Sequence, residues 1–404
     1  MPKHASSQLE FVALMASLMS VVALAIDALL PALDIIGFDI GIQVEADNQL
    51  LITMIFLGLG IGPLLFGPLS DSKGRKPMVF IGFAIFLIAS VVCVLSKSLE
   101  VMILGRILQG VGLSAPRTMA IAIIRDRYSG DYMARIMSFV TVVFLLIPIV
   151  APALGKFILD QWGWQAIFYV QALISLFVML WFWKRQRETL APENKIAFSP
   201  SIFISGFNEI RSHKTTMGYT VISGFITGSF MVYLSASQQV FQNQYLLKEE
   251  FPYIFAGLAV AIGSAIFLNA SFVIRFGMKK IIHAALYAFF IVSCSYVFLF
   301  LNTENPSIIV LLSFFAAQFF SIGFMFGNLR AIAMEPVGHI AGIAAALTGL
   351  ISTLMAVGIS TFIGRFVQDT VLPLFIGFSV CGALSIFVIL FLRASSKQPK
   401  TINA

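Results

Sequence analysis

The chain has 404 residues, of which 59% are hydrophobic and only 11% are charged, and its mean hydropathy is +0.95. A soluble domain typically carries about 25% charged residues, so this composition excludes a water-soluble protein and predicts an integral membrane protein. The net charge of +7 does not indicate a nucleic-acid site, because the basic residues gather in the segments expected on one side of the membrane.

Twelve apolar runs are long enough to form spanning helices, which need roughly 20 residues each. The alternation that a membrane β-barrel requires is absent, so the sequence predicts an all-α membrane protein with twelve transmembrane helices. The first run contains Asp27 and is too long for the apolar part of a signal peptide, so we interpret it as the first helix. The runs are centred near Leu24, Phe56, Phe86, Ala115, Leu145, Phe177, Phe225, Ala261, Phe290, Phe319, Leu350 and Phe387.

The longest polar interruption divides the runs six and six, which predicts a bundle over 1–184, a cytoplasmic linker over 185–214 and a second bundle over 215–404. The two halves resemble each other at an offset of 209 positions, at which Gln109 matches Gln318. Chance similarity between apolar sequences is the alternative explanation. Two pseudo-symmetric six-helix bundles are a known transporter architecture, with the substrate site between them near the midplane.

The distribution of basic residues follows the positive-inside rule if both termini are cytoplasmic. The segments then expected inside hold most of the Lys and Arg residues, including the linker. The segments expected outside hold Lys97, Lys156, Lys248 and Arg365. The basic surplus therefore predicts the orientation of the chain and not a ligand site.

Residues 23–34 read ALAIDALLPALD and place a carboxyl group and a proline inside the first run. Pro31 has no N–H, so the carbonyl oxygen of Asp27 loses its helical hydrogen bond and the helix can bend there. A break of this kind is tolerated in a membrane only where protein or a water-filled cavity covers it. The sequence therefore predicts a covered break around Asp27.

The fourth run contains RILQGVG, which begins at Arg106. At about 1.5 Å per residue, Arg106 and Asp27 both lie roughly 10 Å below the outer boundary, so they can share one layer of the bundle. Burial favours the neutral form of a carboxyl group and a nearby arginine favours its charged form, which together predict that Asp27 gains and loses a proton. The alternatives are a structural pair, a counter-ion for the substrate, and an Arg106 that snorkels to the outer surface. Arg117, eleven residues further along the same run, either extends its side chain to the inner membrane surface or lines the substrate cavity.

The segment GPLSDSKGRK at 67–76 follows the second run and predicts a tight turn on the inner side. Gly74 permits a backbone conformation that other residues resist, and the pair Arg75–Lys76 would anchor to anionic headgroups. Asp71 would cap a helix or pair with an arginine such as Arg125. An ordinary charged loop is the alternative.

This turn resembles the G-x-L-x-D-x-x-G-R-K pattern of the major facilitator superfamily, and RILQGVG resembles its R-x-x-Q-G-x-G pattern. The stretch from Asp27 to Leu33 is similar to the D-x-Y-L-P-A-L signature of the Bcr/CflA multidrug exporters, which are bacterial drug:proton antiporters of twelve helices. The sequence departs from the patterns of this family at two places. Leu29 stands where the signature has a tyrosine. In the fifth run, the region that begins at Pro148 is similar to the family's antiporter motif, but the glycine-rich half of that motif is missing before Pro148. The resemblance implies gating or structural roles for Gly67, Asp71, Gly74, Arg75, Lys76, Gln109, Gly112, Arg125, Asp126, Pro148, Pro152 and Gly155.

The second half carries no acidic residue in the middle of a run, so we assign proton chemistry to the first half. Its polar residues are candidates for hydrogen bonds to a substrate, and hydrogen bonds between helices are an equal alternative for the amides. The candidate cavity residues of the whole chain are Asp27, Arg117, Tyr233, Gln238, Asn269, Gln318 and Asn328.

These patterns predict a secondary transporter, not an enzyme, that exports small amphipathic compounds such as drugs in exchange for protons by alternating access. An exporter of one metabolite or siderophore and a proton-coupled importer are the alternatives. We expect a monomeric, multi-pass protein of the bacterial inner membrane, in contact with the lipid bilayer and without a nucleic-acid partner. No cofactor or metal is expected, since the histidines are scattered and the three cysteines, Cys93, Cys294 and Cys381, lie in separate runs.

Overall fold

The computed structural model describes residues 8–196 and 199–396, and these residues form helices and no strands. Eleven stretches of the described chain are long and apolar enough to cross a membrane, and one of them, Ile308–Gly364, contains two helices. The predicted all-α membrane fold is therefore confirmed. The elements are α1 (Gln8–Asp27), η1 (Leu30–Ala32), α2 (Leu33–Asp39), η2 (Glu45–Gln49), α3 (Leu50–Lys73), α4 (Arg75–Val94), α5 (Leu99–Arg127), α6 (Gly130–Trp162), α7 (Trp164–Arg185), η3 (Pro192–Asn194), α8 (Ser201–Ser212), α9 (Lys214–Gln238), η4 (Gln239–Gln244), α10 (Phe251–Phe276), α11 (Met278–Phe300), α12 (Ile308–Met334), η5 (Glu335–Ile340), α13 (Ala341–Gly364) and α14 (Leu372–Ser396).

The chain forms two compact units, which we describe separately. The first unit contains the residues up to Pro200 together with Ser235–Ala259, and the second contains Ser201–Leu234 together with the residues from Val260 onward. The end of α9, the π-helical turn η4 and the start of α10 thus belong to the first unit. The three-part division expected from the sequence stays a prediction.

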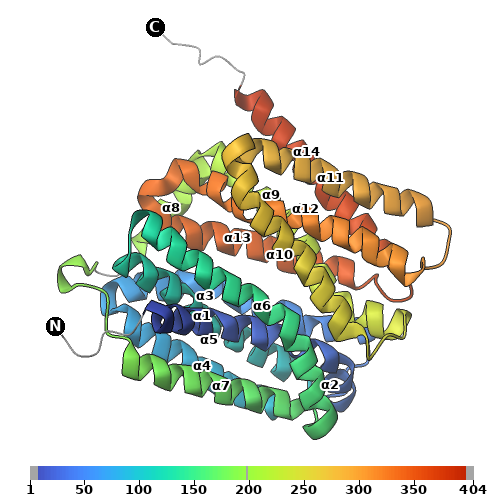
Figure 1. Cartoon of the computed structure of the whole chain (residues 1–404), viewed down its shortest axis with the longest axis horizontal. Helices are drawn as coiled ribbons and strands as arrows, with labels where there is room; N and C mark the ends of the chain where they lie inside the picture. The colour runs from blue at the N-terminus through green and yellow to red at the C-terminus, as the bar shows by residue number, and fades with distance from the viewer. Residues whose placement is uncertain (1–7, 197–198, 397–404) are drawn as a thin grey trace. The chain divides into compact units, whose positions relative to one another are not determined.

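In the first unit, α5 packs against both α3 and α4 (Figure 1). Glycines allow the close approach: a Cβ atom at Gly110 of α5 would lie 2.0 Å from the carbonyl oxygen of Ile55, on α3. On the α4 side, a Cβ atom at Gly112 would lie 2.7 Å from the carbonyl oxygen of Gly82. Small residues of this kind let membrane helices pack backbone against backbone, so Gly112 has a structural role in this unit.

In the second unit, α11 packs against α12 and α14 (Figure 1). Aromatic rings fill the space between these helices: Tyr296 of α11 stacks on Phe375 of α14 with centroids 3.8 Å apart, and Phe314 of α12 meets Tyr296 edge-on at 5.2 Å. The short helix α8 packs against α13, where a Cβ atom at Gly206 would lie 3.1 Å from the side chain of Ile343.

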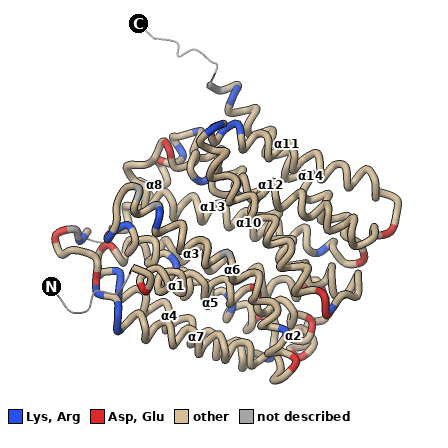
Figure 2. Tube along the Cα trace, viewed as in Figure 1, with Lys and Arg blue, Asp and Glu red and all other residues tan. Residues whose placement is uncertain are grey.

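Charged residues lie mainly at the ends of the helices, and the long middle sections carry few of them (Figure 2). In the first unit, Lys and Arg gather at the end where α3 meets α4, and Asp and Glu gather at the end where α1 is followed by α2. We call these the basic end, which includes Arg75 and Lys76, and the acidic end, which includes Asp34 and Glu45.

Candidate functional site

Helix α1 is interrupted at Asp27, and the chain passes through η1 before α2 begins. The N–H of Leu29 donates to the carbonyl oxygen of Ile26 at 3.4 Å, three residues back, and Pro31 has no N–H to donate. All residues from Asp27 to Leu33 are buried. The break that the proline predicts is therefore present and is covered by protein.

Arg106 of α5 is fully buried and binds oxygens on two neighbouring helices. Its Nη1 and Nη2 both donate to the carbonyl oxygen of Ala25 at 3.2 Å, and its Nε donates to that of Leu51, on α3, at 2.7 Å. Nη1 also donates to Oε1 of Gln109 at 2.8 Å, and Nε2 of Gln109 donates to Oγ of Ser90, on α4, at 2.9 Å. One buried network thus joins α1, α3, α4 and α5 beside the break.

Asp27 is 5% exposed, and among the described residues no hydrogen bond or ion pair joins its carboxyl group to Arg106. The guanidinium instead binds the carbonyl oxygen of Ala25, which the break leaves without the N–H of Leu29. The two residues expected to share a layer do lie in one region of the bundle, because Ala25 is only two positions from Asp27. A structural pair between the two side chains, which was one of the alternatives, is absent from this arrangement, because Nη1 and Nη2 of Arg106 donate to the freed carbonyl oxygen of Ala25. That Arg106 influences proton binding by Asp27 stays a prediction.

Helices α6 and α7 close the break from two further directions. A Cβ atom at Gly155 of α6 would lie 1.9 Å from the carbonyl oxygen of Ala28, so the backbones of α6 and the break are in contact. Nε2 of Gln171, on α7, donates to the carbonyl oxygen of Leu24 at 3.3 Å. Gln171 was not among the residues singled out from the sequence; a glutamine in the middle of an apolar run is the signal that marks it.

An apolar pocket of about 260 Å³ lies between α1, α6 and α7, and its α1 residues, Ser17 to Leu24, precede Asp27. Leu24 and Ser20 contribute from α1, Val150 and Leu154 from α6, and Val178 from α7. The two prolines expected to bend this region, Pro148 and Pro152, both lie inside α6.

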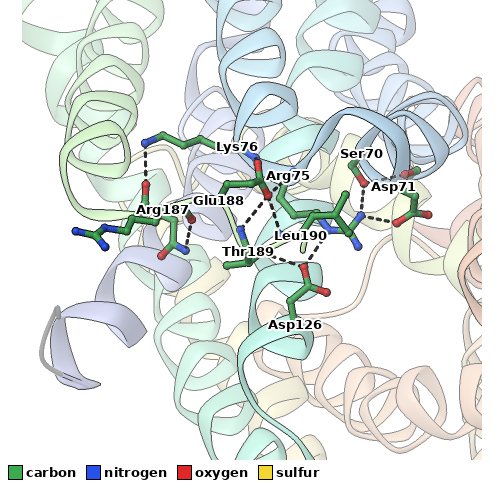
Figure 3. Close-up of polar contacts among 11 residues, drawn as sticks. Ser70, Asp71, Arg75, Lys76, Asp126, Arg187, Glu188, Thr189 and Leu190 are labelled. Atoms are coloured by element: carbon green, nitrogen blue, oxygen red, sulfur yellow. Dashed lines mark hydrogen bonds and ion pairs between the residues drawn. The ribbon is translucent and has the colours of Figure 1, made fainter. Parts of the chain in front are cut away.

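At the basic end, Arg75 connects the turn between α3 and α4 to the end of α5 (Figure 3). Its Nε donates to Oδ2 of Asp126 at 3.0 Å, and its Nη1 donates to Oγ of Ser70 at 2.7 Å and contacts Oδ1 of Asp71. Asp71 therefore pairs with Arg75, whereas the sequence had suggested Arg125, which is exposed. Arg125 precedes Asp126 by one residue, so its side chain leaves the helix end in another direction.

The segment after α7 also reaches this turn, and nothing in the local sequence predicts this contact. The carboxylate of Glu188 accepts hydrogen bonds from the backbone N–H groups of Arg75 and Lys76 at 3.0 and 2.9 Å. Partial burial alone would raise the pKa of Glu188, but hydrogen bonds from backbone N–H groups, those of Leu190 and Lys76 first, hold it below its ordinary value.

At the acidic end, residues of α2 and η2 contact the segment 235–259 within the first unit. Oδ1 of Asp34 accepts from Nδ2 of Asn48 at 3.1 Å, and Oδ2 accepts from Nδ2 of Asn243 at 2.9 Å. Nζ of Lys156 lies 3.0 Å from a carboxylate oxygen of Glu249. Asp34 is thus half-buried and hydrogen-bonded.

Three amide candidates of the second half form hydrogen bonds within their unit. Nε2 of Gln318 donates to the carbonyl oxygen of Phe289 at 3.2 Å and also to Oγ of Ser293, both on α11. Nδ2 of Asn328 donates to Oδ1 of Asn269, on α10, at 2.7 Å. Gln318 thus binds a serine of the preceding helix just as Gln109 does in the first unit, which agrees with the internal repeat.

The remaining candidates differ in their surroundings. Tyr233 is buried and its ring centroid lies 4.4 Å from that of Phe319. Nε2 of Gln238 donates to Oε1 of Gln242 at 3.3 Å, and Arg117 is half-buried on α5. A substrate-binding role for these residues and for the three amides stays a prediction.

The sequence matches the Major Facilitator Superfamily over residues 15–360. A relative in Bacillus subtilis, the uncharacterized MFS-type transporter YdgK, is 30% identical over 348 residues, which are 84% of this chain and 85% of the relative. The bicyclomycin resistance protein homolog of Haemophilus influenzae is 27% identical over 93% of this chain and 94% of its own. The multidrug resistance protein MdtL of Salmonella typhimurium is 26% identical over 90% of each chain.

Two solved structures share the fold. The xylose transporter XylE from E. coli aligns with a TM-score of 0.72 at 13% identity, over 96% of this chain and 97% of its own. The human organic anion transporter MFSD10 aligns with a TM-score of 0.63 at 15% identity, over 96% of this chain and all of its own. At these identities the similarity concerns the fold alone.

Proposed function

The chain belongs to the Major Facilitator Superfamily, and from this premise we propose that it exports small amphipathic compounds from the cell in exchange for protons. Relatives named for bicyclomycin resistance and multidrug resistance cover nine-tenths or more of the chain and support this substrate class. The protein would be a secondary transporter that works by alternating access, without enzymatic chemistry.

The observation that carries the proposal is the buried carboxyl group of Asp27 at the break of α1. Burying a carboxylate without a partner is costly, and the group then tends to take up a proton instead. Acidic residues inside membrane helices are rare and commonly mark proton pathways. In the first unit Asp27 combines near-complete burial with a helix break, which is the setting expected of a proton carrier.

Arg106 would act on Asp27 through the backbone. Its guanidinium holds the carbonyl oxygen of Ala25 and thereby fixes the end of α1 at the position where Asp27 begins the break. In this proposal Asp27 binds a proton from outside and releases it inside, when a compound enters from the cytoplasm.

The apolar pocket beside α1 supports an amphipathic substrate. Its lining is almost entirely aliphatic, with Ser17 and Ser20 as the polar groups, and it lies on the helix that carries Asp27. Asp27 itself does not line the pocket, so a compound bound there would act on the carboxyl group through α1, whose residue Leu24 belongs to the lining. Because each ligand would lower the affinity for the other, proton release and compound binding are linked by one coupling free energy.

A transport experiment with purified protein tests the proposal. Proteoliposomes with an imposed pH gradient are loaded with a panel that includes bicyclomycin, ethidium and tetraphenylphosphonium, and the flux of each compound is measured. Export driven by protons moving inward supports the proposal. Flux of the opposite sign would assign the chain as an importer, and flux independent of the gradient for every compound would remove the proton coupling.

We further propose a monomer in the inner membrane of a bacterium, with both termini in the cytoplasm. The basic end of the first unit, with Arg75 and Lys76, would then face the cytoplasm according to the positive-inside rule. The bacterial relatives support the cellular setting.

A further inference from the structure

The first turn of α4 has no capping side chain of its own. The residue before the helix is Gly74, which has a φ angle of +106° and no side chain to accept hydrogen bonds. The first N–H groups of any helix lack intrahelical partners and need acceptors from elsewhere. In α4 these acceptors come from Glu188, which lies 113 positions further along the chain: Oε1 binds the N–H of Arg75 at 3.0 Å and Oε2 binds that of Lys76 at 2.9 Å.

The opposite contact is present as well, so two helix ends cap each other (Figure 3). Nζ of Lys76 donates to the carbonyl oxygens of Trp183 and Gln186, at the C-terminus of α7, at 3.0 and 2.8 Å. A carboxylate at a helix N-terminus and an ammonium group at a helix C-terminus each complement the helix dipole. The start of α4 and the end of α7 are therefore joined by a reciprocal exchange of charged caps.

The segment that follows Glu188 is fixed along the same turn. Oε1 of Glu188 also accepts from the N–H groups of Thr189 and Leu190 at 2.9 and 3.0 Å, so the carboxylate shapes its own loop. Oγ1 of Thr189 donates to Oδ2 of Asp126 at 3.0 Å, and the N–H of Ile196 donates to the carbonyl oxygen of Asp71 at 3.0 Å. The segment 188–196 thus touches the ends of α3 and α5 as well as the start of α4.

The positive φ angle at position 74 favours glycine. A Cβ atom there would also lie 2.5 Å from Oε2 of Glu188, so any other residue would displace the end of this side chain from its present position. Glycine therefore leaves room for the carboxylate where it now lies.

We propose that Glu188 is a positioning residue for transport, which anchors the segment 188–196 to the turn between α3 and α4. The inference rests on the proposed function, because a transport cycle is what the anchored turn would serve. This stretch of the first unit ends at Pro200, four positions after the segment, so the anchor fixes the chain shortly before it continues into the second unit. It also holds the backbone of Arg75 while the side chain of Arg75 binds Asp126.

The test compares three variants: Glu188→Ala removes the acceptors, Glu188→Gln keeps one oxygen, and Glu193→Gln is the matched control. Glu193 is an exposed glutamate of the same segment. Amide hydrogen exchange is followed at Arg75 and Lys76 in the purified full chain. We expect exchange at these two amides to become roughly five- to tenfold faster in Glu188→Ala, less so in Glu188→Gln, and to stay at the wild-type rate in the control.

Bicyclomycin transport in proteoliposomes supplies the functional measurement. We expect Glu188→Ala to lower kcat several-fold with KM nearly unchanged, because the anchor lies at the basic end of the first unit, whereas the break in α1 leads into α2 at the acidic end. Unchanged exchange at Arg75 and Lys76 in Glu188→Ala would overturn the proposed cap. Faster exchange with wild-type kcat, or an equal loss in Glu193→Gln, would overturn the positioning role.

The exchange measurement needs no substrate, so it separates the two proposals. A wild-type protein that moves no compound would remove the proposed function, while exchange at the two amides would still decide whether Glu188 caps α4. Glu188→Gln keeps the test decisive if Glu188→Ala does not fold.

Discussion

Replacing Gly155 by alanine tests whether the contact between α6 and the break of α1 is as close as the structure indicates. In an ordinary helix interior, a change from glycine to alanine stabilises by about 0.5–1 kcal/mol, because the unfolded chain loses freedom. At Gly155 the new Cβ atom would lie 1.9 Å from the carbonyl oxygen of Ala28, and real Cβ contacts essentially never fall below 3.0 Å. The backbone of α6 must therefore move away from the break by about 1.1 Å.

The cost of the extra methyl group decides whether Gly155→Ala raises or lowers the free energy of unfolding. Extra methyl groups in a well-packed core cost typically about 1–3 kcal/mol, which exceeds the gain from alanine propensity. We expect Gly155→Ala to lower the free energy of unfolding by about 1–2 kcal/mol. Transport should fall as well, because Ala28 follows Asp27 directly and its displacement moves the carboxyl group.

The matched control is Gly263→Ala, on α10, where a Cβ atom meets nothing within 4 Å. Both variants are unfolded by detergent titration at equilibrium, and their transport rates are measured in parallel. We expect the control to be as stable as the wild-type protein or slightly more so. A Gly155→Ala protein that matches the control in stability and in transport would refute the close contact.

Three further outcomes are expected. Arg106→Met should destabilise the protein by about 1–3 kcal/mol, as measured by the same titration, because the carbonyl oxygen of Ala25 is left buried without a donor; a neutral effect would show that this oxygen finds another partner. Because the folded-state pKa of Glu188 is lowered, its contribution to stability is complete above about pH 4.3 and is lost as the pH falls through the folded pKa. The difference in stability between wild type and Glu188→Gln should therefore shrink on acidification, and a difference that grows would contradict the cap. Asp71→Asn should slow transport more than it weakens compound binding, measured by flux and by equilibrium titration; an equal loss of affinity would contradict a role in the turn.

The break in α1 could be predicted because its cause is local. Pro31 removes a hydrogen-bond donor four positions after Asp27, and that effect is written in the sequence. The partner of Arg106 could not be predicted, because the acceptor is a backbone oxygen and every residue has one. Only the packing of α1 against α5 shows that the carbonyl oxygen of Ala25 lies within reach.

At the basic end, too, some features of the turn follow from the local sequence and others do not. The need for glycine at position 74 and the presence of a charged cluster follow from the pattern GPLSDSKGRK. Which acid binds Arg75 depends on the direction in which side chains leave the end of α5, where Asp126 faces the turn and Arg125 is exposed. Glu188 joins the turn from the far end of α7, and a contact over 113 positions leaves no trace in local sequence.

If Asp27 exchanges a proton as a compound binds, proton release measures the exchange most directly. Purified protein in a weakly buffered solution with a pH-sensitive dye is mixed with each compound that it transports. We expect the wild-type protein to release protons on binding and Asp27→Asn to bind the compound with no release. Equal release from the two proteins, or none from the wild type, would contradict the account.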